Sequence, residues 1–342
     1  MKQRNVQQEE KKSRQLMRIG LSLLGFVIAG AIIYIGVQMI AGKKTATSPE
    51  AYRYHYVFLA DDMDDLFWKE VCRETQEQAK KKDVYVEDLS QIYGENHDKA
   101  QLLEIATSMN VDGIIIQGDD SDKTKELIQK AQEKGIPVIT ALEDAPDSGR
   151  VSFIGVGDYN IGREYGREII RIATKDTKKV LLLEEHTENQ DLIYSGIQDV
   201  LRNEGNHLNL QIESMNSQTD TTFGLEEQVR IKLMSEEQRP DIIICTSEQD
   251  TLSVSHLIVD YNMVNQVRIL GYYMSDQIFK GIQSGSISAS VTIDTNALGK
   301  ECVDTMEQYR KDGHTSDYVA MDAQTITRKN IEEYMKNDKT EK

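Results

Sequence analysis

The chain has little cysteine, and this scarcity excludes one kind of architecture. Its three cysteines, Cys72, Cys245 and Cys302, are scattered through 342 residues. Small secreted domains that depend on disulfides carry many cysteines, usually in even numbers. We therefore expect these side chains to be small buried apolar groups. The sequence predicts no disulfide framework, although it leaves one pair open.

Motifs for catalysis and metal binding are also missing. The sequence contains neither the G-x-S-x-G of a nucleophile elbow nor the G-x-x-x-x-G-K-[ST] of a phosphate loop. Its six histidines are far apart, and none has a second ligand at helical spacing, so they predict no zinc site. The acidic run at 61–65 lacks the glycine and the terminal glutamate of a calcium loop. These absences predict a protein that is not an enzyme and has no cofactor.

Positive charge is scarce after the first 44 residues. The net charge of the chain is −17. Residues 1–44 hold eight Lys or Arg and two Glu, a balance of +6, which leaves −23 for the rest of the chain. Nucleic-acid binding depends on basic side chains that neutralise phosphates. The acid-rich body therefore predicts that nucleic acid is not a partner.

Near the N-terminus the chain has a long apolar run without charge, residues 19–41. At about 1.5 Å per residue this run covers about 34 Å, enough to cross a hydrocarbon layer of about 30 Å. Six basic residues precede the run and two follow closely, so the positive-inside rule places the N-terminus in the cytoplasm. The apolar part of a cleaved signal peptide is usually shorter, about 7–15 residues. We expect an uncleaved, single-pass membrane anchor.

The anchor divides the chain into a small cytoplasmic part and a large extracytoplasmic part. We predict a basic cytoplasmic tail at 1–18, the transmembrane anchor at 19–41 and a polar tether at 42–51. The remaining residues then form an extracytoplasmic domain at the cell membrane.

From Tyr52 onward the chain alternates strand and helix patterns. Segment 111–148 shows the unit: the apolar strand Gly113–Gln117, then Ser121 as a helix cap, and Gly135 as the helix end. Two series of such units follow each other and predict two lobes, each with a parallel sheet. Predicted strands lie near Tyr54–Ala60, Val84–Leu89, Gly113–Gln117, Val138–Thr140, Val151–Gly155, Lys179–Leu183, Leu208–Glu213, Asp241–Cys245, Arg268–Tyr272 and Ala289–Thr292. Predicted helices lie near Phe67–Lys81, His97–Met109, Lys123–Glu133, Tyr159–Ala173, Leu192–Glu204, Gly224–Ser235, Leu252–Tyr261 and Ser275–Ser284.

Several motifs, in the right order over residues 52–335, carry a resemblance to a known family. VDGIIIQGDDSD (111–122), GIPVIT (135–140) and DAPDSGRVSFIGVGDYNIGR (144–163) stand with LFW (66–68) and GSISASVTIDTNALGKE (285–301). Together they resemble the type I periplasmic binding proteins, in the group of ribose-binding proteins and the sugar-binding domain of lactose-repressor-like proteins.

The resemblance implies two Rossmann-like α/β lobes joined by a hinge that the chain crosses three times. The implied crossings lie near Gly155–Gly157, Thr292–Thr295 and Asp322–Gln324, with Gly155, Gly157 and Thr292 as hinge residues. The implied N-terminal lobe is 52–156 plus 294–322. The C-terminal lobe is 157–293 plus 323–335. The GVGDYN segment lacks the third glycine of a dinucleotide-binding fingerprint, which favours the hinge.

The resemblance also implies a ligand site between the lobes. Its implied residues are Asp65, Phe67, Trp68, Gln117, Glu143, Asp158, Tyr159, Ser247, Glu248, Tyr273 and Asp294. Several departures from the family pattern stand out. The family's Asn-Pro before the aromatic pair is Asp65-Leu66 here, and the arginine of its second lobe is replaced by Ile193. Losing three charge-assisted hydrogen bonds would cost about 5 kcal/mol, or more than about three decades in affinity.

Three interpretations of the altered site are left open by these departures. The site is rebuilt around the polar residues just named, or it takes a less polar or cationic ligand against Trp68, Tyr159 and Tyr273, or the domain has lost its small ligand.

The primary function predicted is an extracytoplasmic solute-binding protein that captures a carbohydrate-like ligand for an ABC-type sugar transporter, with its permease as partner. The alternative is an accessory receptor for a membrane sensor histidine kinase. We do not expect a repressor, because residues 1–18 are too few for a DNA-binding headpiece.

Overall fold

The computed structural model describes residues 52–94, 97–184, 190–205, 207–217 and 224–336. Residues 52–342 form one compact unit, and this unit is described by itself. The predicted tail, anchor and tether lie outside the described residues. Within the described part, no helix combines the length and the apolar character that a membrane crossing needs.

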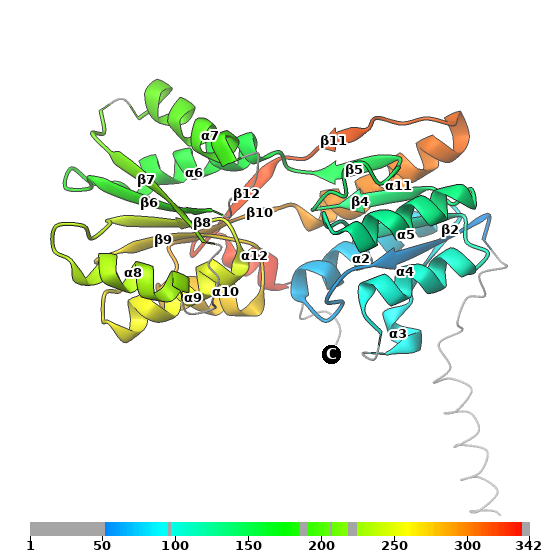
Figure 1. Cartoon of the computed structure of the whole chain (residues 1–342), viewed down its shortest axis with the longest axis horizontal. Coiled ribbons are helices and arrows are strands. Elements are labelled where there is room, and N and C mark those ends of the chain that lie inside the picture. Colours follow the sequence, from blue (N-terminus) through cyan, green and yellow to red (C-terminus); the bar gives the residue numbers. More distant parts are fainter. Residues whose placement is uncertain (1–51, 95–96, 185–189, 206, 218–223, 337–342) are drawn as a thin grey trace, which may run out of the picture. The chain divides into compact units, whose positions relative to one another are not determined.

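The first lobe is built on a six-stranded parallel sheet with strand order β11-β5-β4-β3-β1-β2. Figure 1 shows helices on both faces of this sheet. Its strands are β1 (Tyr54–Leu59), β2 (Val84–Asp88), β3 (Gly113–Gln117), β4 (Val138–Ala141), β5 (Ser152–Gly155) and β11 (Tyr318–Ala320). Its helices are α2 (Leu66–Lys81), α3 (Ser90–Tyr93), α4 (Lys99–Ser108), α5 (Asp122–Glu133) and α11 (Thr295–Asp312).

The second lobe repeats this plan with strand order β12-β10-β9-β8-β6-β7. All its strand pairs are parallel except β12, which runs antiparallel to β10. Its strands are β6 (Lys179–Glu184), β7 (Gln211–Asn216), β8 (Ile242–Cys245), β9 (Arg268–Tyr272), β10 (Ala289–Ile293) and β12 (Ala323–Thr327). Its helices are α6 (Asp158–Ile172), α7 (Gln190–Asn203), α8 (Gly224–Met234), α9 (Glu248–Asp260), α10 (Asp276–Ser284) and α12 (Ile331–Lys336). The predicted two-lobed α/β fold is confirmed.

The chain passes between the two sheets three times. It crosses from β5 to α6, returns from β10 to α11, and crosses again from β11 to β12. Gly155 is the last residue of β5, and Gly157 is the N-cap of α6. Thr292 lies buried in β10, where it pairs with Gln324 of β12. The fold therefore has the three-crossing hinge that the resemblance implies.

Side chains of the central strands alternate between two cores of the first lobe. Ile114 and Ile116 of β3 join Leu127 and Ile128 of α5 on one face. Ile115 faces the other way, into a core that also holds side chains of α2 and α11. All five residues of β3 are buried, as a parallel strand covered on both faces requires. The predicted cap of the next helix is also confirmed, because the Ser121 hydroxyl accepts a hydrogen bond from the Thr124 backbone N–H.

The structure corrects the predicted sheets in two places. Each sheet has six strands rather than five, because the third crossing adds the short edge strands β11 and β12. The strand predicted at Leu208–Glu213 is β7 at Gln211–Asn216. Leu208 instead belongs to a turn, where its N–H donates to the carbonyl of Gly205 at 2.8 Å. This edge strand has no fully buried residue and so no strong apolar pattern, which leaves its position poorly marked in the sequence.

Helices α6 and α7 pack at glycines. A Cβ on Gly162 of α6 would overlap the backbone carbonyl of Ile193 in α7. A Cβ on Gly196 of α7 would in turn overlap the backbone carbonyl of Tyr159. The two helix backbones therefore approach each other more closely than any side chain permits.

We predict that Gly162→Ala lowers the free energy of unfolding by about 1–3 kcal/mol, because the helices must separate to admit the methyl group. Urea titration of a fragment covering residues 52–342 measures this loss. Ser195→Ala is the control, since Ser195 is exposed on α7 beside the contact. Gly162→Ala with native or greater stability would contradict the close packing.

Candidate ligand-binding site

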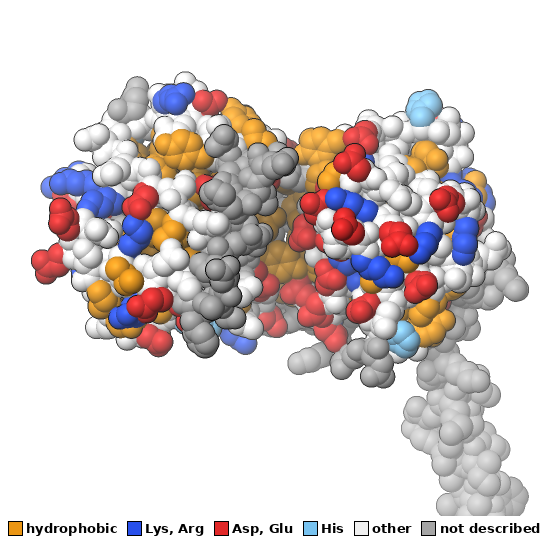
Figure 2. Space-filling model, viewed as in Figure 1, with side chains coloured by type: hydrophobic (Ala, Val, Ile, Leu, Met, Phe, Trp, Pro, Cys, Tyr) orange, Lys and Arg blue, Asp and Glu red, His pale blue; other side chains and the backbone are white. Residues whose placement is uncertain are grey.

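A cleft of about 1070 Å³ is lined by residues of both lobes. Its walls come from the loops at the carboxyl ends of the strands, where open α/β sheets bind ligands. Figure 2 shows acidic side chains gathered along the edge of the first lobe that faces the second. Ten carboxyl side chains line the cleft, namely Asp61, Asp62, Asp65, Asp120, Glu143, Asp144, Asp158, Glu184, Glu248 and Asp317.

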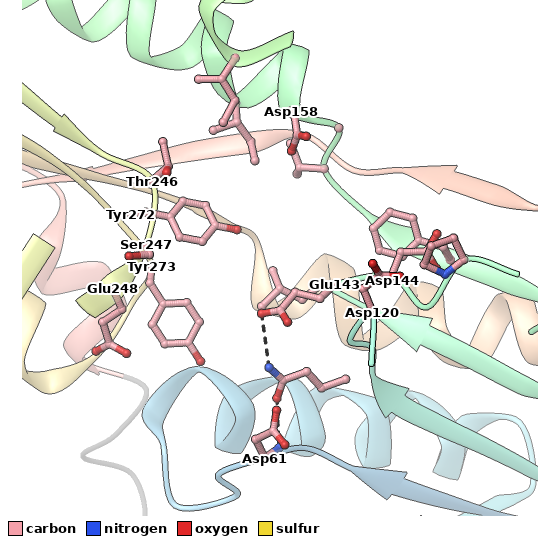
Figure 3. A pocket seen from close by; sticks show the side chains of 18 of the residues that line it. Asp61, Asp120, Glu143, Asp144, Asp158, Thr246, Ser247, Glu248, Tyr272 and Tyr273 are labelled. Carbon is pink, nitrogen blue, oxygen red and sulfur yellow. Dashed lines mark hydrogen bonds between the residues drawn. The ribbon is translucent and has the colours of Figure 1, made fainter. Parts of the chain in front are cut away.

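The floor on the first-lobe side is organised by Gln117, the last residue of β3. Its side-chain oxygen accepts a hydrogen bond from the Asp61 backbone N–H at 3.0 Å. Its amide nitrogen donates to Glu143 at 3.4 Å, a long contact. One buried amide therefore holds the loops after β1 and β4 in place, and it leaves most of the Glu143 carboxylate facing the cleft (Figure 3).

Two basic residues beside the floor are committed to loop carboxylates. The buried Lys99 ammonium lies 2.8 Å from Asp61 and 2.9 Å from Asp119. Arg150 donates through two nitrogens to Asp144, one of them at 2.7 Å. Its third nitrogen donates to the Asp317 carboxylate at 2.8 Å. Arg150 therefore ties the loop after β4 to the segment that leads into β11.

The second-lobe wall combines hydroxyl groups, a carboxylate and aromatic rings. Ser247 caps α9, because its hydroxyl accepts from the Asp250 N–H at 3.1 Å. Glu248 follows as the first residue of that helix. Burial raises the pKa of the Glu248 carboxyl, and a hydrogen bond from Ser275 partly offsets this effect. The phenol of Tyr272, at the end of β9, points into the cleft (Figure 3).

A hydrogen bond joins the lobes at one end of the cleft. The Tyr273 hydroxyl, from the second lobe, donates to the Asp65 carboxylate of the first lobe at 2.8 Å. The Tyr273 ring also lies 5.1 Å from that of Phe67. Tyr273 has a φ of +83°, a left-handed conformation that is unfavourable for a bulky residue. The interlobe contact thus forms on strained backbone.

Eight of the eleven residues predicted for the site line the cleft. They are Asp65, Trp68, Gln117, Glu143, Asp158, Ser247, Glu248 and Tyr273. Trp68 presents little surface there, because it is 2% exposed and packs edge-on against Phe67 with ring centroids 5.1 Å apart. The structure therefore offers no open indole face for a sugar ring.

The other three predicted residues do not line the cleft, and each has a different role. Phe67 is fully buried in the core. The Tyr159 hydroxyl donates to Asp199 of α7 at 2.5 Å. The Asp294 carboxylate caps α11, where it accepts from the backbone N–H groups of Asn296 and Ala297. In the structure their side chains are used for packing, hydrogen bonding and capping.

Sequence reasoning missed several residues of the cleft. Phe153 and Tyr318 line it as a stacked pair with ring centroids 5.3 Å apart. Arg150 and Tyr272 were also missed. The position of Phe153 in β5 and of Tyr272 at the end of β9 was a usable signal, because strand ends form this kind of site. Tyr318 had no such signal, since its three-residue strand was not predicted.

Burial acts on the carboxylates that face the cleft. It raises the pKa of Asp158. It also raises the pKa of Glu143, against the smaller effects of Lys99 and the Gln117 amide. For Asp65, burial outweighs the hydrogen bonds from Tyr273 and the backbone. The cleft thus disfavours the ionised form of these groups.

Comparison with known proteins agrees with this architecture. Residues 56–314 match the family model described as "Periplasmic binding protein domain", so the chain belongs to the periplasmic binding protein family. No curated protein matches the chain. Many solved structures are similar to the chain, and the three described next share 23% of its sequence or less, so this likeness shows the fold alone.

The first of these is the arabinose-binding protein AraP from Geobacillus stearothermophilus, with 18% identity, a TM-score of 0.70, and coverage of 82% of this chain and 99% of that one. A sugar-binding protein of a sugar ABC transporter from Bacillus halodurans has 18% identity, a TM-score of 0.69, and coverage of 82% and 100%. A mutant XylFII–LytSN complex has 23% identity, a TM-score of 0.64, and coverage of 82% and 99%.

We predict that Asp158→Asn stabilises the empty protein at neutral pH. The folded state raises the Asp158 pKa above its ordinary value of 3.8, so ionisation costs stability above that range. The gain in unfolding free energy should shrink as the pH falls from 7 towards 4, because the folded carboxyl takes up its proton at a higher pH than the unfolded one, and it should vanish only below the ordinary value of 3.8. Thermal unfolding of both proteins between pH 4 and 7 measures the difference.

The matched control is Asp276→Asn, because Asp276 is likewise the first residue of a helix but is exposed. Loss of its favourable position at the helix N-terminus predicts a small destabilisation. A gain for Asp158→Asn that is absent at pH 7, or that grows as the pH falls, would contradict the burial of this carboxyl.

Proposed function

We propose that the protein is a receptor that binds a carbohydrate-like solute in the cleft between its lobes and performs no catalysis. The observation that carries this proposal is the position of the cleft, at the carboxyl ends of both sheets and across a three-crossing hinge. The arabinose-binding and sugar-binding structures with the same fold support a carbohydrate as the solute class.

The cleft offers the groups that a polyhydroxylated solute requires. Carboxylates such as Glu143 and Asp158 accept hydrogen bonds from hydroxyl groups, and such bonds to charged groups are the stronger kind. The Tyr272 phenol and the Ser247 hydroxyl face the same space from the second lobe. A ligand that contacts both lobes would stabilise the closed arrangement, because contacts made to one arrangement alone shift the equilibrium towards it.

The proposed location is the outer face of the cell membrane. The apolar run at 19–41 and its basic flank support a single-pass anchor with the N-terminus in the cytoplasm. In this position the receptor delivers its solute to the permease of an ABC-type sugar transporter. The sugar ABC transporter protein with the same fold supports this role.

A sensory role is the second candidate, and a separate observation favours it. One structure of the same fold is a XylFII–LytSN complex, which shows that this architecture occurs with a partner protein. An anchored receptor stays beside its partner, which suits a membrane sensor kinase at least as well as a transporter. In this role the closed lobes would act on the outer domain of the kinase.

We predict that the fragment 52–342 binds a sugar or polyol and that Tyr272→Phe weakens this binding about two- to tenfold, the value of one neutral hydrogen bond. A thermal-shift screen followed by calorimetry identifies the solute, because a ligand that binds the native state raises the melting temperature. Tyr261→Phe is the control, since Tyr261 lies outside the cleft lining. If no sugar, sugar derivative or polyol shifts the melting temperature, the proposed solute class is wrong.

We predict that the full chain, cross-linked in membranes of its own host, is isolated with permease subunits, and more strongly when the solute is present. Mass spectrometry of the captured proteins gives the result. A sensor kinase captured without permease subunits would instead establish the second candidate. A variant without residues 1–41 is the control for capture that depends on the anchor.

A further inference from the structure

The cleft has an unusual charge balance for a site that holds a neutral solute. Ten carboxyl side chains line it, against one basic side chain among the described lining residues, Arg150. Arg150 is already shared between Asp144 and Asp317. Its side chain is 9% exposed, so it is not free to reach a ligand. The one positive charge among these lining residues is therefore already paired with carboxylates of the protein itself.

Three of these carboxylates have no basic partner among the described residues. Glu143 contacts the uncharged Gln117 amide, and Glu248 contacts the uncharged Ser275 hydroxyl. Asp158 has no hydrogen bond or ion pair from another described side chain. Lys99 lies nearby, but its ammonium group forms ion pairs with Asp61 and Asp119. Among the described residues, no ion pair therefore compensates the negative charge at these three points.

These three groups come from different elements and line the same cleft. Glu143 extends from the loop after β4, Asp158 from the start of α6 and Glu248 from the start of α9. Figure 3 shows the Tyr272 and Tyr273 rings on the side of the cleft that carries Glu248, facing Glu143. Aromatic faces attract cations through the ring quadrupole, and they provide a second kind of contact for positive charge.

We propose that the solute is a carbohydrate or polyol that carries a protonated amino group, held by Glu143 and Asp158 against the Tyr272 ring. The inference rests on the proposed function, since it names the chemical class of the solute in the same cleft. It combines two of the interpretations that the sequence left open, a site rebuilt around polar residues and a cationic ligand.

Desolvation supplies the physical reason. A solute that fills the cleft removes water from these carboxylates. Removing water from an ionised carboxylate without supplying a counter-ion is strongly unfavourable. A neutral sugar replaces part of this water with hydrogen bonds from its hydroxyl groups, but it supplies no opposite charge. An ammonium group supplies the missing counter-charge and donates up to three hydrogen bonds.

The two solute types have opposite pH dependence. A neutral solute deepens the burial of the carboxylates and favours their protonated form, so its affinity falls as the pH rises from about 4 to about 7. A cationic solute favours the ionised form, so its affinity rises over the same interval. Its affinity also falls with added salt, because screening weakens charge attraction.

The experiment is isothermal titration of the full chain, kept in a mild nonionic detergent, with matched pairs of solutes. The probes are D-glucose with D-glucosamine, D-galactose with D-galactosamine, and sorbitol with glucamine, at pH 4 to 7. In at least one pair the amine should bind about tenfold to about a hundredfold more tightly at pH 7, the value of one hydrogen bond to a charged group.

Asp158→Asn should lower the ratio of the amine's affinity to the neutral solute's affinity by at least about tenfold. The affinity for the neutral solute should change less than the affinity for the amine. Asp276→Asn makes the same change outside the cleft lining and should leave the preference intact. The melting temperature of each variant shows that it is folded. An unchanged preference in Asp158→Asn would show that this carboxylate does not hold the ammonium group, which overturns the assigned contact.

The outcomes separate this inference from the proposed function. If the neutral member of each binding pair binds equally well or better, the protein is a carbohydrate receptor and the cationic solute class is wrong. If neither member of any pair binds at millimolar concentration, the carbohydrate-like solute itself is wrong, and the inference fails with it.

Discussion

Burial of parallel strands on both faces is the constraint on which this structure depends. Strands such as β3 and β8 have no exposed residue, because crossover helices cover the sheet on both sides. Polar groups that must meet a ligand are therefore confined to the strand ends. The three crossings then bring the ends of two sheets to one cleft, which explains why residues 61, 117, 143 and 272 meet despite their distance in the sequence.

Basic residues at this cleft belong to its framework. Lys99 and Arg150 both lie at or beside the cleft, and both are paired with carboxylates from neighbouring loops. Each of these loops is held by an ion pair. Apolar packing cannot hold them, because the loops are open to water. The acidic excess of the cleft is what remains after these pairs have formed. The same carboxylate chemistry therefore serves both the shape of the site and its charge.

The sequence predicts the fold well wherever residues are buried in a regular pattern. The unit around Gly113–Gln117 was predicted with its helix cap, because its apolar run and its Ser121 are local signals. Strands β11 and β12 were missed, since short edge strands are selected by pairing with distant segments. In the site, strand-end positions such as Gln117 were predicted, whereas Arg150 was not. Its role depends on Asp317, which is 167 residues away.

The third crossing has a consequence for how the protein is made. β11 completes the edge of the first sheet and β12 completes the edge of the second, and both belong to the last stretch of the chain. The helix before them, α11, packs against α2 near the beginning of the domain. Synthesis proceeds from the N-terminus, so the first sheet is complete only when residue 320 has emerged and the second only when residue 327 has emerged. Both sheets are therefore completed late in biosynthesis, by strands that lie within ten residues of each other in the sequence.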